Sequence, residues 1–144
     1  MTKRMTKRMT TKRMTTRIIR IGARRQYAVV VDAVDYAWLR QWKWSFTRFC
    51  WKYGVRIYAR RCVMRGGRKI AVYMHRVILA ERMRRRRPSP THTCDHRDND
   101  SLDNTRRNLA WATPSEQRIN QRRRITRAEA VAYEVADAGC GRSR

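Results

Sequence analysis

The chain has 144 residues, enough for one domain or two small ones. Its 36 Lys and Arg against 11 Asp and Glu give a formal net charge of +25, so the expected partner is a polyanion: DNA, RNA or an anionic membrane surface. The hydrophobic fraction of 42% is that of a globular protein, which excludes a purely disordered basic tail. No apolar stretch is long enough to predict a membrane span.

The spacing of the cysteines argues against a zinc site of the common kind. They stand at Cys50, Cys62, Cys94 and Cys140, and no two of them are close enough for a C-x₂₋₄-C ligand pair. No zinc is therefore expected, and the cysteines are expected to be reduced thiols.

The N-terminal part is predicted to hold an arm and a hairpin. Residues 1–17 repeat the units MTKR and MTTR without an acidic residue, which indicates a disordered basic arm. The β-branched runs at 17–21 and 27–31 are separated by Gly22 and predict a hairpin. A helical turn is expected over 34–41.

A three-stranded sheet is expected next, because short β-rich runs are separated by turn residues. The strands are predicted at residues 42–51, 55–63 and 69–73, with a turn at residues 65–68 (RGGR). In the second strand an apolar row alternates with a basic row: Val55, Ile57 and Ala59 against Arg56, Tyr58 and Arg60. One face of the sheet should therefore pack on the core, and the other should meet solvent or a ligand.

A helix over 74–83 is predicted to close this first module, which spans 18–83. The segment 84–90 follows as a run of arginines and the tripeptide Pro-Ser-Pro. Proline cannot continue a helix, so this segment is predicted to be a linker between two modules.

The second module is predicted over 91–124. Two short extended runs, 91–96 and 108–113, flank a turn-rich segment. A helix should start at Thr113-Pro114-Ser115-Glu116 and run to about residue 124, because Thr113 can cap it and Glu116 can close a capping box. A second box predicts one more helix within the C-terminal segment, 125–144.

Four of the eleven acidic residues lie together in the second module: Asp95, Asp98, Asp100 and Asp103. Carboxylates repel a phosphate backbone unless a cation lies between them, and Mg²⁺ is held by one or two carboxylates, water and substrate phosphate oxygens. The alternative is a polar turn, because Asp and Asn are common turn residues. Composition alone favours neither interpretation.

The residues around this cluster resemble the HNH endonuclease family, in particular the small phage and intron-encoded homing endonucleases. The resemblance rests on three motifs: Asp95-His96, LDNTRRNL over residues 102–109, and WATPSEQ over residues 111–117 followed by Asn120. It implies a ββα-metal module, in which two strands and a helix surround one divalent ion, Mg²⁺ or Mn²⁺. The implied activity is hydrolysis of phosphodiester bonds in double-stranded DNA, as a nick or a double-strand cut.

The resemblance implies roles for four residues. His96 would be the general base on the attacking water, and Asn108 would orient it by accepting the other ring N–H. Asp95 would bind the metal, which bridges the scissile phosphate and stabilises the departing 3′ oxygen. Gln117 stands where the family usually carries His or Asn, so its amide oxygen would reach the metal from one methylene further away.

This departure keeps a second interpretation open: a catalytically decayed DNA-binding protein of the same fold. A basic RNA-binding or ribosome-associated protein is a third interpretation. It fits the charge but not the Asp cluster or the motifs around it.

The first module resembles the DNA-binding region of the same endonucleases, which is similar to the sheet and helix of plant ethylene-response-factor domains. The motifs are DYAWLRQWKW, YGVRIYARR and IAVYMHRVIL, and they imply a sheet that lies in the major groove of DNA. His75, within the third motif, is predicted to be structural. The predicted DNA contacts are Arg56, Tyr58, Arg60, Arg61, Arg65, Arg68, Lys69, Arg84, Arg85, Arg122 and Arg123.

The predicted fold class is therefore α+β: a small antiparallel sheet with a helix, followed by a ββα-metal module. Double-stranded DNA is the expected partner, no membrane and no obligate protein partner are expected, and the chain is expected to be a monomer. The resemblance alone implies the cytoplasm of a bacterial host or of a phage-infected cell.

Overall fold

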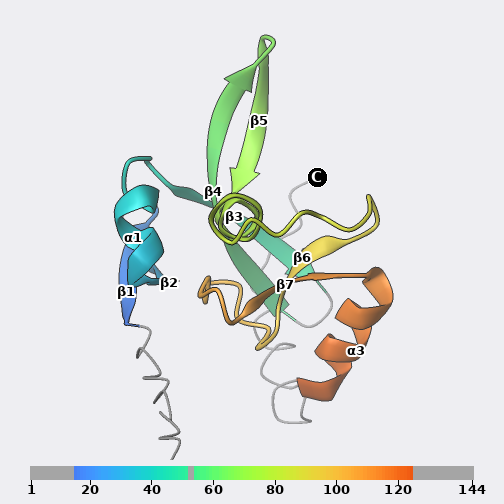
Figure 1. Cartoon of the computed structure of the whole chain (residues 1–144). Coiled ribbons are helices and arrows are strands. Elements are labelled where there is room, and N and C mark those ends of the chain that lie inside the picture. Colours follow the sequence, from blue (N-terminus) through green and yellow to red (C-terminus); the bar gives the residue numbers. More distant parts are fainter. Residues whose placement is uncertain (1–14, 52–53, 125–144) are drawn as a thin grey trace, which may run out of the picture.

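The computed structural model describes residues 15–51 and 54–124 (Figure 1). They form a mixed α+β fold of small antiparallel sheets and short helices, so the predicted fold class is confirmed at this level. Residues 1–14 of the predicted arm and the predicted helix within 125–144 lie outside the described residues.

The predicted N-terminal hairpin is confirmed. Its strands are β1 (Thr16–Ile21) and β2 (Tyr27–Asp32), which pair antiparallel. Because side chains alternate along a strand, Ile19 and Val29 face the core as a cross-strand pair. The helix α1 (Ala33–Leu39) follows β2 directly and buries Leu39.

The second sheet has the order β3-β4-β5, with β3 (Ser45–Trp51), β4 (Gly54–Arg65) and β5 (Arg68–Tyr73). The predicted first strand starts later than expected because the α1–β3 connection holds Trp44, whose ring nitrogen Nε1 donates to the Leu39 carbonyl (2.8 Å). Pairing of β3 with β4 ends at Arg60, so the outer part of β4 pairs with β5 alone. The β4–β5 hairpin consequently projects from the body of the molecule (Figure 1).

The helix predicted over 74–83 consists of two kinds of turn. It begins as α2 (Met74–Val77) and continues as the π-helical turn η1 (Ile78–Arg82), in which the Met83 amide donates to the Ile78 carbonyl (2.9 Å). Such wider turns are rare and are not encoded by apolar spacing. Together, α2 and η1 bury Met74, Val77, Ile78 and Leu79.

The second predicted module contains two strands and one helix: β6 (Thr93–His96), β7 (Leu109–Ala112) and α3 (Pro114–Arg124). β6 and β7 pair antiparallel, with His96 opposite Leu109. The predicted capping box is confirmed: the Thr113 amide donates to Glu116 Oε2 (2.7 Å), and the Glu116 amide donates to Thr113 Oγ1 (3.3 Å).

One hydrophobic core joins elements on both sides of the predicted linker. Its most buried members are Ile21, Val29, Val31, Leu39, Met74, Ile78, Leu79 and Leu109. The turn before β7 is also hydrogen-bonded along β2: the Val30 amide donates to the Leu102 carbonyl (2.9 Å), and the Asn104 amide donates to the Val30 carbonyl (2.8 Å). The division at 84–90 stays a prediction, but the segments on either side of it share this core.

A buried ion-pair cluster reinforces this junction. Asp35 on α1 is fully buried and accepts hydrogen bonds from Arg82 Nε (2.9 Å) and from Arg106 Nε and one terminal guanidinium nitrogen (2.7 and 2.6 Å). Burial alone would raise the pKa of Asp35, but hydrogen bonds from the two guanidinium groups outweigh it and lower the pKa below the usual value of 3.8. The cluster therefore joins α1, η1 and the turn that precedes β7.

Two predictions on composition can be compared with the structure. Cys62 and Cys94 are free thiols, whereas Cys50 is disulfide-bonded, so the prediction of reduced cysteines is wrong at Cys50. Among the residues that the structure describes, no helix is both long and apolar enough to cross a membrane.

Candidate functional site

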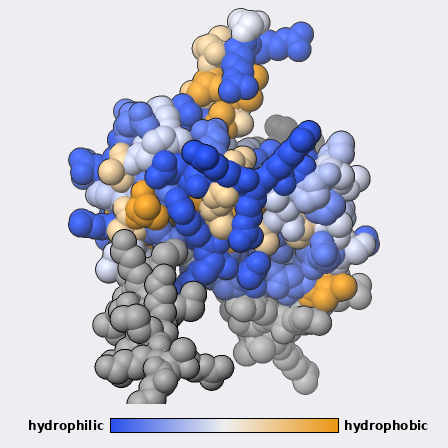
Figure 2. Space-filling model, viewed as in Figure 1, coloured by the Kyte–Doolittle hydropathy of each residue, from blue (hydrophilic) through white to orange (hydrophobic). Residues whose placement is uncertain are grey.

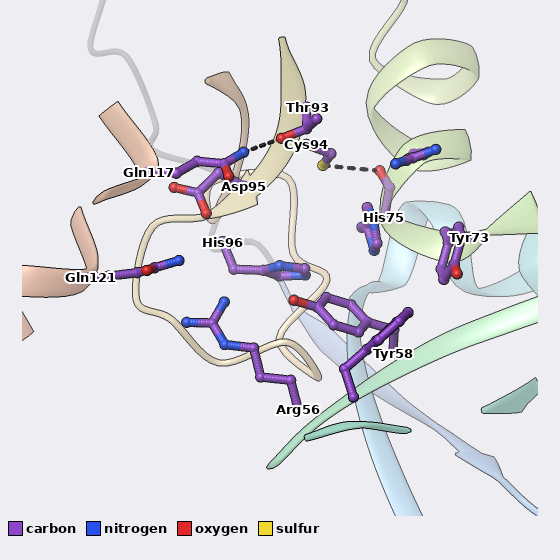
Figure 3. A pocket seen from close by; sticks show the side chains of 12 residues that line it. Arg56, Tyr58, Tyr73, His75, Thr93, Cys94, Asp95, His96, Gln117 and Gln121 are labelled. Atoms are coloured by element: carbon purple, nitrogen blue, oxygen red, sulfur yellow. Dashed lines mark hydrogen bonds between the residues drawn. The ribbon is translucent and has the colours of Figure 1, made fainter. Parts of the chain in front are cut away.

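A pocket of about 400 Å³ opens where the second sheet, α2, β6 and α3 meet (Figure 3). Its wall combines polar side chains with aromatic rings. The lining residues are Phe49, Arg56, Tyr58, Tyr73, His75, Arg76, Thr93, Cys94, Asp95, His96, Gln117 and Gln121. The pocket therefore brings three of the four residues predicted to act together, Asp95, His96 and Gln117, to one place.

The helix α3 holds one face of β6 through two amide side chains. Asn120 Nδ2 donates to Asp95 Oδ2 (3.0 Å) and to the His96 carbonyl (3.2 Å), and Gln117 Nε2 donates to Thr93 Oγ1. Thr93 and Asp95 are two residues apart on a strand, and Gln117 and Asn120 are three apart on a helix, so each pair shares a face. The capping box fixes where α3 begins, and it thereby sets which residues face β6.

His96 is almost fully buried, and one of its ring nitrogens is fixed. Nε2 lies 2.9 Å from Asn104 Oδ1, and because an amide oxygen only accepts, Nε2 carries the proton. Burial is the main cause that lowers the pKa of His96 below 6.5; Arg56 acts in the same direction, whereas Asn104, Asp95 and Asp98 oppose it. The ring is therefore neutral at pH 7, with Nδ1 as the unprotonated nitrogen.

The prediction that Asn108 orients the imidazole of His96 is wrong, because the ring is hydrogen-bonded to Asn104. Asn108 instead closes the turn that precedes β7: its Nδ2 donates to Asp98 Oδ1 (2.7 Å) and to the Asp103 carbonyl (2.8 Å), and its Oδ1 accepts from the Asp98 amide (3.0 Å). Both amides lie in one turn-rich segment, so the spacing could not tell which one faces His96.

Three of the four residues of the aspartate cluster stabilise turns, as the polar-turn interpretation predicted. Asp98, Asp100 and Asp103 each accept a hydrogen bond from the backbone amide two residues later, at 2.8, 2.9 and 3.0 Å. This is the usual way in which Asp stabilises a turn. Only Asp95 of the four lines the pocket.

His75 belongs to the pocket wall, although the sequence favoured a purely structural role. Its ring centroid is 5.1 Å from that of His96 and 5.5 Å from those of Tyr58 and Tyr73. Its Nδ1 is buried without a hydrogen-bond partner in the described part of the chain. Burial, together with the nearby His96 and Arg76, lowers the pKa of His75 well below 6.5. No sequence signal links His75 to His96; the β5–α2 junction brings them together.

The pocket offers two oxygen atoms to a metal ion. Asp95 Oδ1 and Gln117 Oε1 accept no hydrogen bond from the described residues, while the partner atom of each group is anchored to α3 or β6. One carboxylate and one amide oxygen fit a hard ion such as Mg²⁺, which completes its shell with water and substrate. Within residues 15–51 and 54–124, no group of three or more His, Cys, Asp and Glu side chains could hold a metal by itself.

The predicted DNA-binding residues whose side chains the structure describes fall into three groups. Arg56 and Tyr58 were expected on an exposed row, but they are half-buried and line the pocket, because the outer face of β4 is covered there by β6 and its turn. Arg61 points to the opposite face and lies over the ring of Trp42, 4.2 Å from its centroid. The third group is exposed on the surface: Arg65, Arg68, Lys69, Arg84 and Arg85. Arg60 was also expected on the exposed row, but it is half-buried like Arg56 and Tyr58.

Arg122 and Arg123 lie in the last turn of α3, and their side chains are outside the description. Figure 2 shows that hydrophilic side chains dominate the visible face of the body.

The comparisons with known proteins found no relative: no family model, no curated protein and no solved structure matches the chain. The site geometry and the sequence motifs are therefore the basis for a functional proposal.

Proposed function

We propose that this protein is a metal-dependent endonuclease of the HNH type, which hydrolyses phosphodiester bonds in double-stranded DNA. One observation carries the proposal: the adjacent residues Asp95 and His96 line the same pocket, and each is fixed by a separate amide side chain, Asn120 and Asn104. A fixed carboxylate beside a fixed neutral imidazole is what hydrolysis with one metal ion requires.

His96 acts as the general base in this proposal. Its Nε2–H donates a hydrogen bond to Asn104 Oδ1. The lone pair of Nδ1 can therefore accept a proton from the attacking water. Because burial lowers the pKa of the ring, the base is already unprotonated at pH 7. Asn104 acts through His96, as a positioning residue.

Asp95 Oδ1 and Gln117 Oε1 would hold one Mg²⁺ or Mn²⁺. When bound, the ion supplies Lewis-acid stabilisation of the charge that develops on the phosphate and on the leaving 3′ oxygen. Gln117 is anchored through its nitrogen to Thr93, which lies two residues before Asp95 on the same strand, β6. Asn120 holds Oδ2 of Asp95 and so orients the carboxylate.

Double-stranded DNA is the proposed substrate because the pocket and its surroundings are basic. Arg56 and Arg76 line the pocket, where a phosphate group would be stabilised by positive charge. The net charge of +25 supplies long-range attraction to a polyanion. The neighbouring sheet matches the region that, by resemblance, binds duplex DNA.

The test is cleavage of supercoiled plasmids that carry phage genomic fragments, with Mg²⁺, with Mn²⁺ and with EDTA. The wild-type chain should give nicked or linear product only with a metal ion. His96→Ala should lose cleavage by about 10²-fold or more, the usual contribution of a general base, while its affinity for DNA is retained.

The matched control is His92→Ala. His92 lies outside the pocket, with Nδ1 2.7 Å from Ser89 Oγ, so this variant should cut as the wild type does. Cleavage by His96→Ala at the wild-type rate would contradict the assignment of the base.

A DNA-binding protein without cleavage is the second candidate. Gln117 favours it, because Mg²⁺ tolerates poorly placed ligands badly and, among the residues that the structure describes, Asp95 is the only carboxylate that lines the pocket. In the same assay this candidate predicts retarded but uncut DNA under every condition. Gln117→Asn would then test whether the shorter amide restores cleavage.

A further inference from the structure

His75 has a buried side chain that the fold leaves without a hydrogen bond. Only 6% of the residue is exposed, and its Nδ1 is fully enclosed without a partner in the described part of the chain. The other ring nitrogen, Nε2, is not enclosed in this way, and none of the described residues is hydrogen-bonded to it. Burying an imidazole without a partner costs free energy, so we expect the ring to meet its partner in a ligand of the pocket.

Aromatic neighbours hold this ring in the wall of the pocket. It stacks on Tyr73 with an interplanar angle of 28°, and it meets Tyr58 and His96 edge to face, with centroids 5.5 and 5.1 Å away. Figure 3 shows it between the rings of Tyr73 and His96. The backbone is held as well, because Cys94 Sγ donates to the His75 carbonyl (3.7 Å). The imidazole is therefore a fixed group beside the proposed base.

The ring is a hydrogen-bond donor toward the pocket. Burial lowers the pKa of His75 well below 6.5, so the ring is neutral at pH 7 and carries one N–H. Among buried backbone groups, an N–H without an acceptor is rarer than a carbonyl without a donor, and the same preference places the proton of His75 on Nε2. The enclosed Nδ1 then keeps its lone pair, and Nε2–H is the group that a ligand meets.

The surroundings of His75 fit an anionic acceptor. Arg56 and Arg76 line the same pocket, and the guanidinium of Arg76 lies 5.3 Å from the centroid of the Tyr73 ring. A phosphate group that is attacked by water from His96 lies within reach of His75, because the two rings are in contact. A metal ion is a poorer partner for Nε2, since a protonated ring nitrogen has no lone pair to offer.

We propose that His75 is a further catalytic residue of this pocket, whose Nε2–H donates a hydrogen bond to a non-bridging oxygen of the scissile phosphate. A donor that is fixed in advance stabilises the charge that grows on this oxygen in the transition state more than it stabilises the bound substrate. His75 keeps its proton, so the step adds no proton transfer to the one at His96. The inference rests on the proposed function for the reaction that is accelerated, but the contact of His75 with a phosphate group does not depend on cleavage.

Two substitutions separate this hydrogen bond from packing. His75→Phe keeps an aromatic ring on Tyr73 and removes the N–H, whereas His75→Gln removes the ring and keeps an N–H donor on a side chain of similar reach. In the plasmid assay with Mg²⁺, His75→Phe should lower kcat by about 10²-fold, the usual cost of one lost oxyanion donor, and His75→Gln should lower it less. In EDTA, the affinity of His75→Phe for a phage genomic duplex should fall by about fivefold or less, because one hydrogen bond contributes little to binding.

Stability gives a readout that a packing role would not produce. An apolar ring removes the cost of burying an unpartnered imidazole, so His75→Phe should unfold at the same urea concentration as the wild type or at a higher one. A packing role predicts that His75→Phe remains active and that His75→Gln is the impaired variant. A duplex with sulfur in place of the non-bridging oxygen that faces His75 should slow the wild type, and it should slow His75→Phe less.

Nitrogen-15 NMR of the histidine rings in the wild-type chain tests the contact without cleavage and without any variant of His75. In EDTA, Nε2 of His75 should be the protonated nitrogen. Its resonance should move when inorganic phosphate is added, and it should not move with chloride at the same ionic strength. Loss of a signal in His92→Ala identifies the ring of His92, which lies outside the pocket.

Three results would overturn the inference: cleavage by His75→Phe at the wild-type kcat, equal losses in His75→Phe and His75→Gln, or an Nε2 resonance that moves with Mg²⁺ alone and not with phosphate. If the chain cuts and any of these results is found, the nuclease remains and the role of His75 is removed. A phosphate-dependent shift at His75 in a chain that never cuts would keep the phosphate contact and remove the nuclease.

Discussion

Asn104 and Asn108 illustrate how two identical side chains four residues apart take different tasks. Asn104 is held by a backbone hydrogen bond to Val30 and presents its oxygen to His96. The side-chain amide of Asn108 is instead hydrogen-bonded within the turn around Asp98. We expect Asn104→Ala to lower kcat for cleavage with little change in DNA affinity, because the imidazole loses its orientation. Asn108→Ala should instead destabilise the fold by about 1–3 kcal/mol, since it removes the hydrogen bonds with Asp98 and the Asp103 carbonyl that close the turn before β7.

These two effects are separated by measuring urea unfolding and single-turnover cleavage for both variants. Asn104→Asp serves as the conservative control: it keeps an acceptor for Nε2 but adds a negative charge that raises the pKa of His96. The pH profile of cleavage should therefore move upward in that variant. An unchanged profile together with full activity in Asn104→Ala would contradict the positioning role.

His75 makes the stability of the protein depend on pH near neutrality. Its folded pKa is well below 6.5 because burial disfavours the charged ring. Between the folded and unfolded pKa values the unfolded chain binds the extra proton, so the stabilisation is complete above pH 6.5 and is lost as pH falls toward the folded pKa. Urea unfolding at pH 7.5 and 5.5 should show this loss, and His75→Gln should reduce it.

The helix α3 shows what a short sequence signal can determine. The box formed by Thr113 and Glu116 was readable from four residues, and it fixes the start of the helix that carries Gln117 and Asn120 to β6. Thr113→Ala should destabilise the protein by about 1 kcal/mol, the usual value of an N-cap. It should also lower cleavage, because α3 anchors Asp95. Thermal unfolding and plasmid cleavage measure the two effects, and Ser115→Ala, which makes no cap contact, is the matched control.

Local patterns predicted the strands and helices because each one depends on neighbouring residues. The alternation in β4 gave the strand and its two faces correctly, but it could not show that β6 covers part of the basic face, so Arg56 and Tyr58 were expected on the surface. The same limit applies to His75, which meets His96 through packing between distant segments. The π-helical turn was also missed, because apolar spacing does not distinguish it from an α-helix. The predictions failed where the site depends on contacts between residues that are far apart in the sequence.

At the scale of the whole molecule, the shared core predicts that the parts on either side of 84–90 do not fold independently. Without the second part, the core loses Leu109, and Asp35 keeps only one of its two arginines, Arg82. Leaving a buried charge short of its partners costs about 3–5 kcal/mol, which is a large share of the stability of a small protein. We therefore expect one cooperative transition for the full chain and none for fragment 1–87 or fragment 88–144 alone.

Urea unfolding followed by both Trp fluorescence and far-UV circular dichroism tests this expectation, since the two curves should coincide for a single transition. The matched control is a full chain that carries a protease site within 84–90 and is cut after folding. The cut chain should stay associated and folded, because the connection itself contributes little compared with the core and the cluster around Asp35. If each isolated fragment unfolds with its own cooperative transition, the linker separates true domains, and the contacts of Val30 with Leu102 and Asn104 are only a docking surface between them.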